Sequence, residues 1–146
     1  MTSTNTRRLD DVRPGETLPE LAIPITVPLI AGGAIATRDY FPGHHDKDAA
    51  RELGSPHVFM NILTTNGLVQ RYVEGWAGPG ARLSALRLKL GAPNYPGDTM
   101  TFSGEVTECD AEHRRLEVAF QGRNGLGKHV TGTVSVVLPA HREETP

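Results

Sequence analysis

Two side chains able to move protons, Asp39 and His44, lie five positions apart on either side of a Pro42-Gly43 bend. The bend can turn the chain back so that the carboxylate and the imidazole face one small volume and hold the same water molecule. No serine or cysteine nucleophile lies between them. Although Asp and His on a loop are more often solvated or structural, such a pair is suited to proton transfer to and from water or carbon.

The composition limits the class of protein that carries this pair. The 146 residues are enough for one domain with a single core, and the single cysteine, Cys109, excludes an internal disulfide. The 15 basic and 17 acidic side chains are interspersed without a basic block, so no nucleic-acid partner is expected. No apolar run approaches about 18 residues, and Met1–Arg13 lacks the apolar segment of a signal peptide. We expect a cytoplasmic protein that does not bind membranes.

A single domain is expected at residues 18–139, between two polar ends. Residues 1–17 predict a flexible arm, and residues 140–146 form a charged tail of the same kind. The composition changes near residues 78–80, where a front part with bends and helices gives way to a back part made of strands.

The front part predicts an edge strand and two short helices. The β-rich segment 21–27 contains a proline, which suits the edge of a sheet. Pro28 can begin a short apolar helix that ends near Gly32-Gly33, and Asp46 can cap another short helix. These elements flank the Asp39–His44 pair in the sequence.

A long helix and four strands complete the predicted domain. The helix covers Met60–Trp76, with apolar side chains at helical spacing at Ile62, Val69, Tyr72, Val73 and Trp76. Strands follow at residues 83–90, 98–108, 116–121 and 130–138, and the short turns between them make neighbouring strands antiparallel. The expected fold is α+β, with one helix wrapped by a curved antiparallel sheet.

Other chemistry-bearing residues give weaker patterns. His44 and His45 point apart in an extended chain and no second ligand cluster follows, so no metal site is expected. The glycine-rich segment 125–128 is not followed by a helix and predicts a hairpin, not a phosphate site. Four further histidines are expected at the surface: His57, His113, His129 and His141.

Three segments, in the same order along the chain, resemble the MaoC-like, hydratase 2 group of hot-dog proteins. Asp39–Asp46 resembles the group's Asp-x-Asn-Pro-x-His-x-Asp signature. Tyr95–Thr99 resembles the turn that enters its third strand, and Asn124–Val130, followed by Gly132, resembles its last hairpin and strand. The resemblance covers residues 19–139 and implies the hot-dog fold.

A closer similarity concerns the double histidine taken together with Met60–Tyr72. This combination is similar to the small, catalytic subunit of actinobacterial steroid side-chain enoyl-CoA hydratases, which pair with a second, different MaoC-like chain. The similarity implies hydration of a trans-2-enoyl-CoA with a steroid side-chain acyl group. It also implies a heterotetramer, with a homodimer as the second choice. No cofactor is expected, because CoA is part of the substrate.

The resemblance also implies roles for individual residues. Asp39 and His44 match the two catalytic positions and would both hold the catalytic water. His44 is preferred as general base and Asp39 as the group that orients the water, although the sequence leaves that order open. Backbone N–H groups at the start of the long helix would stabilise an enolate-like oxygen. Four residues are expected to contact the substrate: Phe41, Gly43, Asn61 and Ile62.

Two positions depart from the group's pattern. Phe41 stands where the group has Asn, which removes an amide contact, supplies an apolar wall and suits a bulky substrate. Met60 and Asn61 stand where the group has His-Gly. The N–H of Asn61 can still donate, but its side chain narrows the approach for a thioester.

Three other functions remain open for a chain with this pattern. One is a homodimeric (R)-specific hydratase of ordinary fatty enoyl-CoA. Another is a thioesterase, in which a carboxylate activates water toward the carbonyl carbon. The third is a noncatalytic hot-dog subunit, which the presence of both Asp39 and His44 disfavours.

Overall fold

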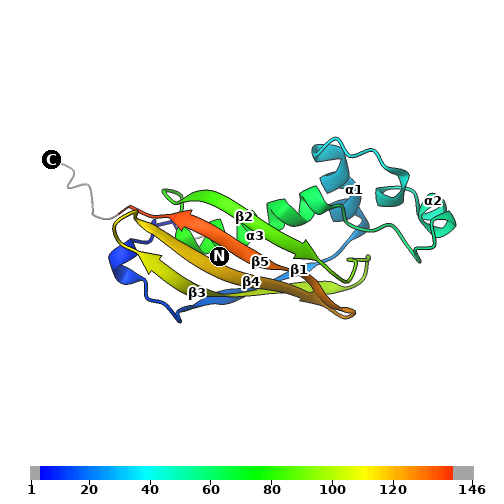
Figure 1. Ribbon diagram of the computed structural model, residues 1–146. Helices are drawn as coiled ribbons and strands as arrows, with labels where there is room; N and C mark the ends of the chain where they lie inside the picture. Colours follow the sequence, from blue (N-terminus) through cyan, green and yellow to red (C-terminus); the bar gives the residue numbers. More distant parts are fainter. Residues whose placement is uncertain (1–3, 140–146) are drawn as a thin grey trace.

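The computed structural model describes residues 4–139, which form a five-stranded antiparallel sheet with one long helix along one of its faces (Figure 1). The strands are β1 Thr17–Pro24, β2 Arg82–Leu90, β3 Thr99–Asp110, β4 Arg115–Asn124 and β5 Gly127–Val137. Their order across the sheet is β1-β3-β4-β5-β2, so β1 is an edge strand, as its proline predicted.

The helices lie partly on the sheet and partly beyond its end. They are α1 Val27–Ala36, α2 Lys47–Glu52 and α3 Ile62–Ala77, with short 3-10 helices η1 at Leu9–Asp11 and η2 at Pro42–His44. α3 runs along the sheet, whereas α1 and α2 form a lobe beside the beginning of α3 (Figure 1). No helix in residues 4–139 is long and apolar enough to cross a membrane.

α3 packs on the sheet through four of the five apolar positions that the sequence predicted, whereas the fifth, Ile62, is 47% exposed. Its buried apolar residues are Leu68, Val69, Tyr72, Val73, Trp76 and Ala77. The ring of Tyr72 stacks on that of Phe102 in β3, with centroids 5.2 Å apart and planes 12° apart. The side chain of Asn61 caps the helix, since its oxygen accepts a hydrogen bond from the N–H of Thr64 at 3.0 Å. The α+β prediction is confirmed.

The predicted flexible arm is wrong for the residues that the structure describes. Leu9 and Val12 are buried in the core. The N–H of Arg7 donates to the carbonyl of Ala77 at 2.8 Å, and its guanidinium lies 4.8 Å from the ring centre of Trp76. The few apolar side chains of this polar segment pack into the core and hold the segment against the domain. Residues 1–3 and the tail predicted at 140–146 lie outside the described residues.

The two short helices are confirmed, but the predicted end of the first is wrong. α1 continues through Gly32 and Gly33 to Ala36. A Cβ atom at Gly33 would collide with the side chain of Thr64, so this glycine allows α1 and α3 to approach closely instead of ending the helix. Asp46 caps α2 through hydrogen bonds from the next N–H groups.

Candidate active site

Asp39 and His44 face each other in the lobe, next to the residue that precedes α3. α1 is followed by Arg38 in the left-handed conformation, with φ of 57°, and the N–H of Asp39 donates to the carbonyl of Ala34 at 2.9 Å. η2 then turns the chain and places Nε2 of His44 3.3 Å from Oδ2 of Asp39. The side chain of His44 is 8% exposed and that of Asp39 is 29% exposed, so the pair is open to solvent from the side of the carboxylate.

The backbone of Phe59 fixes the orientation of the His44 ring. Nδ1 of His44 lies 2.7 Å from the carbonyl oxygen of Phe59. Because a carbonyl can only accept, Nδ1 carries the hydrogen, and Nε2 of the neutral ring presents a lone pair to Asp39. The rings of Phe41 and Phe59 contact the imidazole edge-on, with centroids 5.4 and 4.9 Å away. A proton or a water molecule must therefore bridge Nε2 and the carboxylate.

Hydrogen-bond donors keep Asp39 ionised. Nδ2 of Asn61 donates to Oδ2 at 3.0 Å, and the N–H of Phe41 donates to Oδ1 at 3.3 Å. The hydrogen bond from Asn61 is the main cause that holds the pKa of Asp39 below its ordinary value, with the Phe41 N–H and the charge of His44 adding to it against partial desolvation. Asp39 is therefore suited to orienting water and to stabilising a positive charge on His44.

The first turn of α3 offers free donors next to the pair. The N–H groups of Ile62 and Leu63 have no hydrogen-bond acceptor within residues 4–139. Both residues are nearly half exposed, and the positive end of the helix dipole adds to the potential at this place. An oxygen that develops negative charge can bind here.

The structure brings most of the predicted site residues together. Gly43 is buried, and only a residue without a side chain fits there, because a Cβ atom would come within 3.0 Å of the rings of Phe59 and Phe41. Phe41 remains 46% exposed and Ile62 47% exposed, so both can contact a ligand. Asn61 is buried, with its side chain already engaged. The four substrate contacts stay predictions.

Two expectations about neighbouring residues have clear outcomes. Phe41 was expected to remove an amide contact, but an amide reaches Asp39 from Asn61 at the start of α3. His45 was expected to point away from His44, and its Nε2 lies 3.3 Å from the carbonyl oxygen of Tyr40 at an exposed position.

Sequence reasoning missed Thr37 and Phe59. Thr37 accepts a hydrogen bond from Asn61 at 2.9 Å, and Phe59 acts through its backbone carbonyl. A threonine after an apolar helix carries no pattern that marks it as part of a site. A carbonyl carries no side-chain signal at all, so only the fold identifies these two contributions.

The prediction that His129 lies at the surface is wrong. His129 is 4% exposed, with Nδ1 2.7 Å from the carbonyl of Ala92 and Nε2 2.8 Å from the hydroxyl of Thr65. Burial lowers the pKa of His129, so the ring is neutral and serves the core. His113 is exposed as expected, paired with Asp110, whereas His141 lies outside the described residues.

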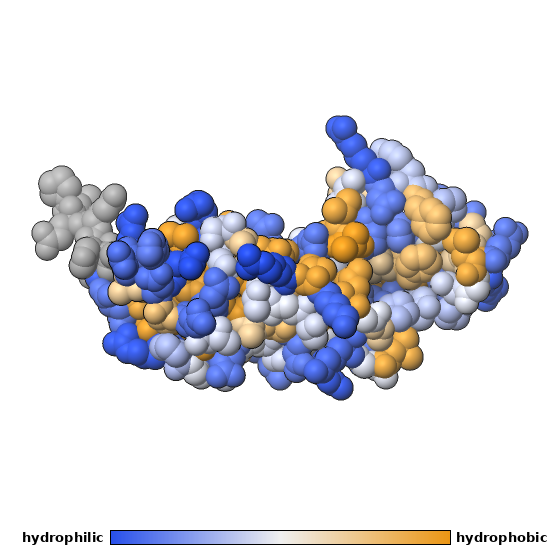
Figure 2. All heavy atoms as spheres, in the orientation of Figure 1, coloured by the Kyte–Doolittle hydropathy of each residue, from blue (hydrophilic) through white to orange (hydrophobic). Residues whose placement is uncertain are grey.

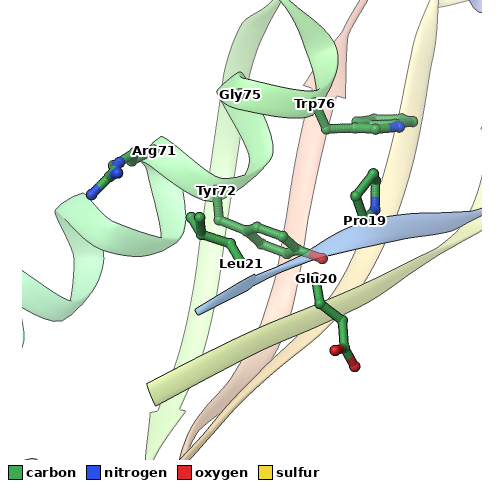
Figure 3. A pocket seen from close by; sticks show the side chains of 7 residues that line it. All are labelled: Pro19, Glu20, Leu21, Arg71, Tyr72, Gly75 and Trp76. Atoms are coloured by element: carbon green, nitrogen blue, oxygen red, sulfur yellow. The ribbon is translucent and has the colours of Figure 1, made fainter. Parts of the chain in front are cut away.

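A separate pocket of about 300 Å³ lies between β1 and α3 (Figure 3). Tyr72 and Trp76 of α3 extend toward Pro19 and Leu21 of β1 in this view. Burial, together with the charge of Glu20, raises the pKa of Tyr72 to about 12, so its hydroxyl stays protonated near neutral pH. Neither Asp39 nor His44 lines this pocket.

Exposed apolar side chains lie on α1, on the loop that carries the pair and on the first turn of α3. Figure 2 shows apolar atoms where the lobe meets the body of the molecule. The exposed large apolar residues of α1, the loop and the first turn of α3 are Val27, Ile35, Tyr40, Phe41, Ile62 and Leu63. A site with two polar proton carriers and an open apolar rim fits a ligand with a reactive polar end and an apolar body.

Known proteins place this arrangement in a family. Residues 11–125 match the family model described as MaoC like domain. The chain is 49% identical, over 124 residues, to the 3-oxo-4,17-pregnadiene-20-carboxyl-CoA hydratase beta subunit of Mycobacterium tuberculosis. The matched region covers 85% of this chain and 95% of that protein.

Solved structures agree in fold. A chain in the crystal structure of the ChsH1-ChsH2 complex from Mycobacterium tuberculosis matches with a TM-score of 0.84 and 47% identity, over 87% of this chain and 98% of that one. The (R)-hydratase from A. caviae involved in PHA biosynthesis matches with a TM-score of 0.81 and 21% identity, over 88% and 98%. At that lower identity the likeness shows the fold alone.

The sheet and the long helix form a hot-dog fold, and the family model and the 49% identical relative show an enzyme of the hydratase class. The chain belongs to the MaoC-like family. The predicted similarity to one subunit of a steroid-type CoA hydratase is confirmed by the 49% identity to such a subunit.

Proposed function

We propose that this chain is the catalytic subunit of an enoyl-CoA hydratase that adds water to a trans-2-enoyl-CoA with a steroid side-chain acyl group. The observation that carries the proposal is the 3.3 Å approach of His44 Nε2 to Asp39 Oδ2 beside the first turn of α3. Hydration needs a base for the water, an acid for the α-carbon and donors for an enolate-like oxygen. The site offers a candidate for each.

In the proposed reaction, His44 acts as base and then as acid. Its Nε2 takes a proton from a water molecule held against Asp39, while the water oxygen bonds to the β-carbon and the electron pair of the double bond moves toward the thioester oxygen. The N–H groups of Ile62 and Leu63 stabilise that oxygen. The imidazolium then gives its proton to the α-carbon, which adds one water in total and restores the neutral ring. No cofactor is needed, because CoA is part of the substrate.

A bulky acyl group is supported by the open apolar rim. Phe41 lies against the imidazole and remains half exposed, so it offers a wall for an apolar chain next to the reacting carbons. The relative at 49% identity is named as a hydratase subunit for a pregnadiene-carboxyl-CoA. A steroid side-chain substrate accounts for both observations.

A heteromeric assembly is supported by the edges of the sheet and by one solved relative. Within residues 4–139, β1 and β2 each pair with a neighbour on one side only. Unpaired strand edges favour assembly with another chain. The similar chain in the ChsH1-ChsH2 structure occurs in a complex. We prefer a heterotetramer of two such chains with two MaoC-like partners, the acyl-CoA lying at a subunit junction, and keep a homodimer as second choice.

The experiment that tests the function compares substrates and products. The chain is assayed alone and with a co-encoded MaoC-like partner, using a steroid side-chain enoyl-CoA and crotonyl-CoA, with the product identified by mass. Hydration of the steroid substrate only in the presence of the partner supports the proposal. Full activity of the isolated chain on that substrate contradicts the heteromeric part.

The same assay separates the alternatives. A free thiol, detected with a colorimetric reagent, indicates a thioesterase. Rapid hydration of crotonyl-CoA by the chain alone indicates a homodimeric hydratase of ordinary fatty enoyl-CoA. The absence of both reactions in the complete complex indicates a noncatalytic subunit.

A further inference from the structure

The side-chain amide of Asn61 makes three hydrogen bonds although the residue is only 3% exposed. Its oxygen accepts from the N–H of Thr64 at 3.0 Å. Its nitrogen donates to Oγ1 of Thr37 at 2.9 Å and to Oδ2 of Asp39 at 3.0 Å. Both N–H donors of the amide are therefore in use.

The partners of the amide determine which of its ends faces Asp39. The N–H of Thr64 can only donate, and an ionised carboxylate can only accept. The hydroxyl of Thr37 gives its hydrogen to the carbonyl of Gly33 at 2.7 Å, so its oxygen is left to accept from Asn61. A flipped amide would place oxygen against the carboxylate and NH₂ against an N–H group, and all these contacts would be lost.

Capping α3 does not explain this arrangement. A helix cap needs an acceptor for the N–H of Thr64, and Ser, Thr or Asp would supply one equally well. None of them brings two further N–H donors. These two donors connect the start of α3 to Thr37, at the end of α1, and to Asp39 in the loop that follows. Thr37 and Asp39 precede Asn61 by 24 and 22 positions in the sequence.

We infer that Asn61 is a positioning residue for Asp39, held in turn by Thr37, so that the carboxylate stays aimed at the water beside His44. The inference rests on the proposed hydration only for its effect on turnover, because the contact with Asp39 is measurable without substrate. The same hydrogen bond favours the ionised carboxylate, so its loss raises the pKa of Asp39.

The test compares Asn61→Ser with Asn61→Ala. Serine keeps an acceptor that can cap α3 but lacks the amide, whereas alanine lacks both. We expect the thermal midpoint to fall in Asn61→Ala and to stay near the wild-type value in Asn61→Ser. In both variants the ¹³C NMR signal of the Asp39 carboxyl carbon should titrate at higher pH than in the wild type. The signal is assigned by its disappearance from the spectrum of Asp39→Asn. With the complete enzyme, kcat should fall roughly tenfold in Asn61→Ser, with KM nearly unchanged.

Each result decides the inference. If the pKa of Asp39 in Asn61→Ser equals that of the wild type, the inference is overturned, whatever happens to activity. If the pKa of Asp39 rises but kcat is unchanged, the hydrogen bond does not position Asp39 for catalysis, and the inference is likewise overturned. A raised titration in a chain that hydrates no enoyl-CoA leaves Asn61 positioning Asp39 and removes the proposed function instead.

Thr37 supplies a second, independent pair of variants. Thr37→Ser keeps the hydroxyl that accepts from Asn61, and Thr37→Val removes it. We expect the Asp39 titration of Thr37→Val to move in the same direction as in Asn61→Ser, by a smaller amount, and that of Thr37→Ser to stay at the wild-type position. Wild-type behaviour of Thr37→Val would remove Thr37 from the arrangement.

Discussion

Nδ1 of His44 lies 2.7 Å from the carbonyl oxygen of Phe59, and this single contact decides which nitrogen of the ring faces Asp39. Because Nδ1 must donate, Nε2 is the atom available to take a proton from water. The edge-on ring of Phe59 packs against the same imidazole. The imidazole is thus held by a backbone group that no side-chain substitution removes.

The first prediction concerns the pair itself. His44→Ala and Asp39→Asn should each lower kcat by about two or more decades, because each removes a positioned proton-transfer group. Steady-state kinetics with circular dichroism as a folding control measures this. His45→Ala is the matched control, since His45 is exposed and lies against the carbonyl of Tyr40. A loss in His45→Ala as large as in His44→Ala would show that the wrong histidine was assigned.

The second prediction concerns the space beside the imidazole. Gly43→Ala places a methyl group within 3.0 Å of the rings of Phe59 and Phe41, so it should lower activity and destabilise the protein by about 1–3 kcal/mol. Gly32→Ala is the control, because nothing lies within 4 Å of a Cβ there. It should stabilise by about 0.5–1 kcal/mol and leave activity intact. Equal stability of the two variants in urea denaturation would contradict the packing around Gly43.

The third prediction concerns pH. The pKa of His129 is lowered from 6.5 by burial, so the unfolded chain binds a proton that the folded chain resists. The stability that the neutral ring contributes is complete above pH 6.5 and is lost as the pH falls toward the folded pKa, by up to about 1.4 kcal/mol per pH unit.

Urea denaturation at pH 7.5 and at about pH 5.5 measures this effect. His129→Gln should lose part of the acid sensitivity, whereas His45→Gln, at an exposed histidine, should keep the wild-type difference. Identical acid sensitivity of wild type and His129→Gln would mean that the buried ring does not resist protonation.

The fourth prediction concerns mass in solution. Light scattering of the chain purified with a co-encoded MaoC-like partner should give the mass of two copies of each, because β1 and β2 leave sheet edges open. The chain purified alone should not give that mass even at high concentration. A stable monomer in both preparations would contradict the assembly proposed here.

Local patterns predicted the parts of the fold and site that depend on neighbouring residues. The Asp39–His44 pair lies within one bend, and α3 and the four later strands follow from periodicity. The capping role of Asp46 is likewise local.

Contacts between distant segments were not predictable in this way. His129 is buried because β5 brings it to Thr65 of α3, 64 positions away in the sequence. Gly33 was predicted to end the first helix. Its actual role depends on the packing of α1 against Thr64 of α3, which the local sequence does not show. The role of Thr37 likewise depends on a residue 24 positions further along the chain.

One consequence of the Asn61 contacts concerns heat inactivation. The same side chain caps the first turn of α3 and holds the carboxylate of Asp39, so fraying of that turn also releases the carboxylate. Helix ends open more easily than the core to which the rest of α3 belongs. Catalysis should therefore fade during heating at temperatures where the sheet is still intact, and it should return at once on cooling.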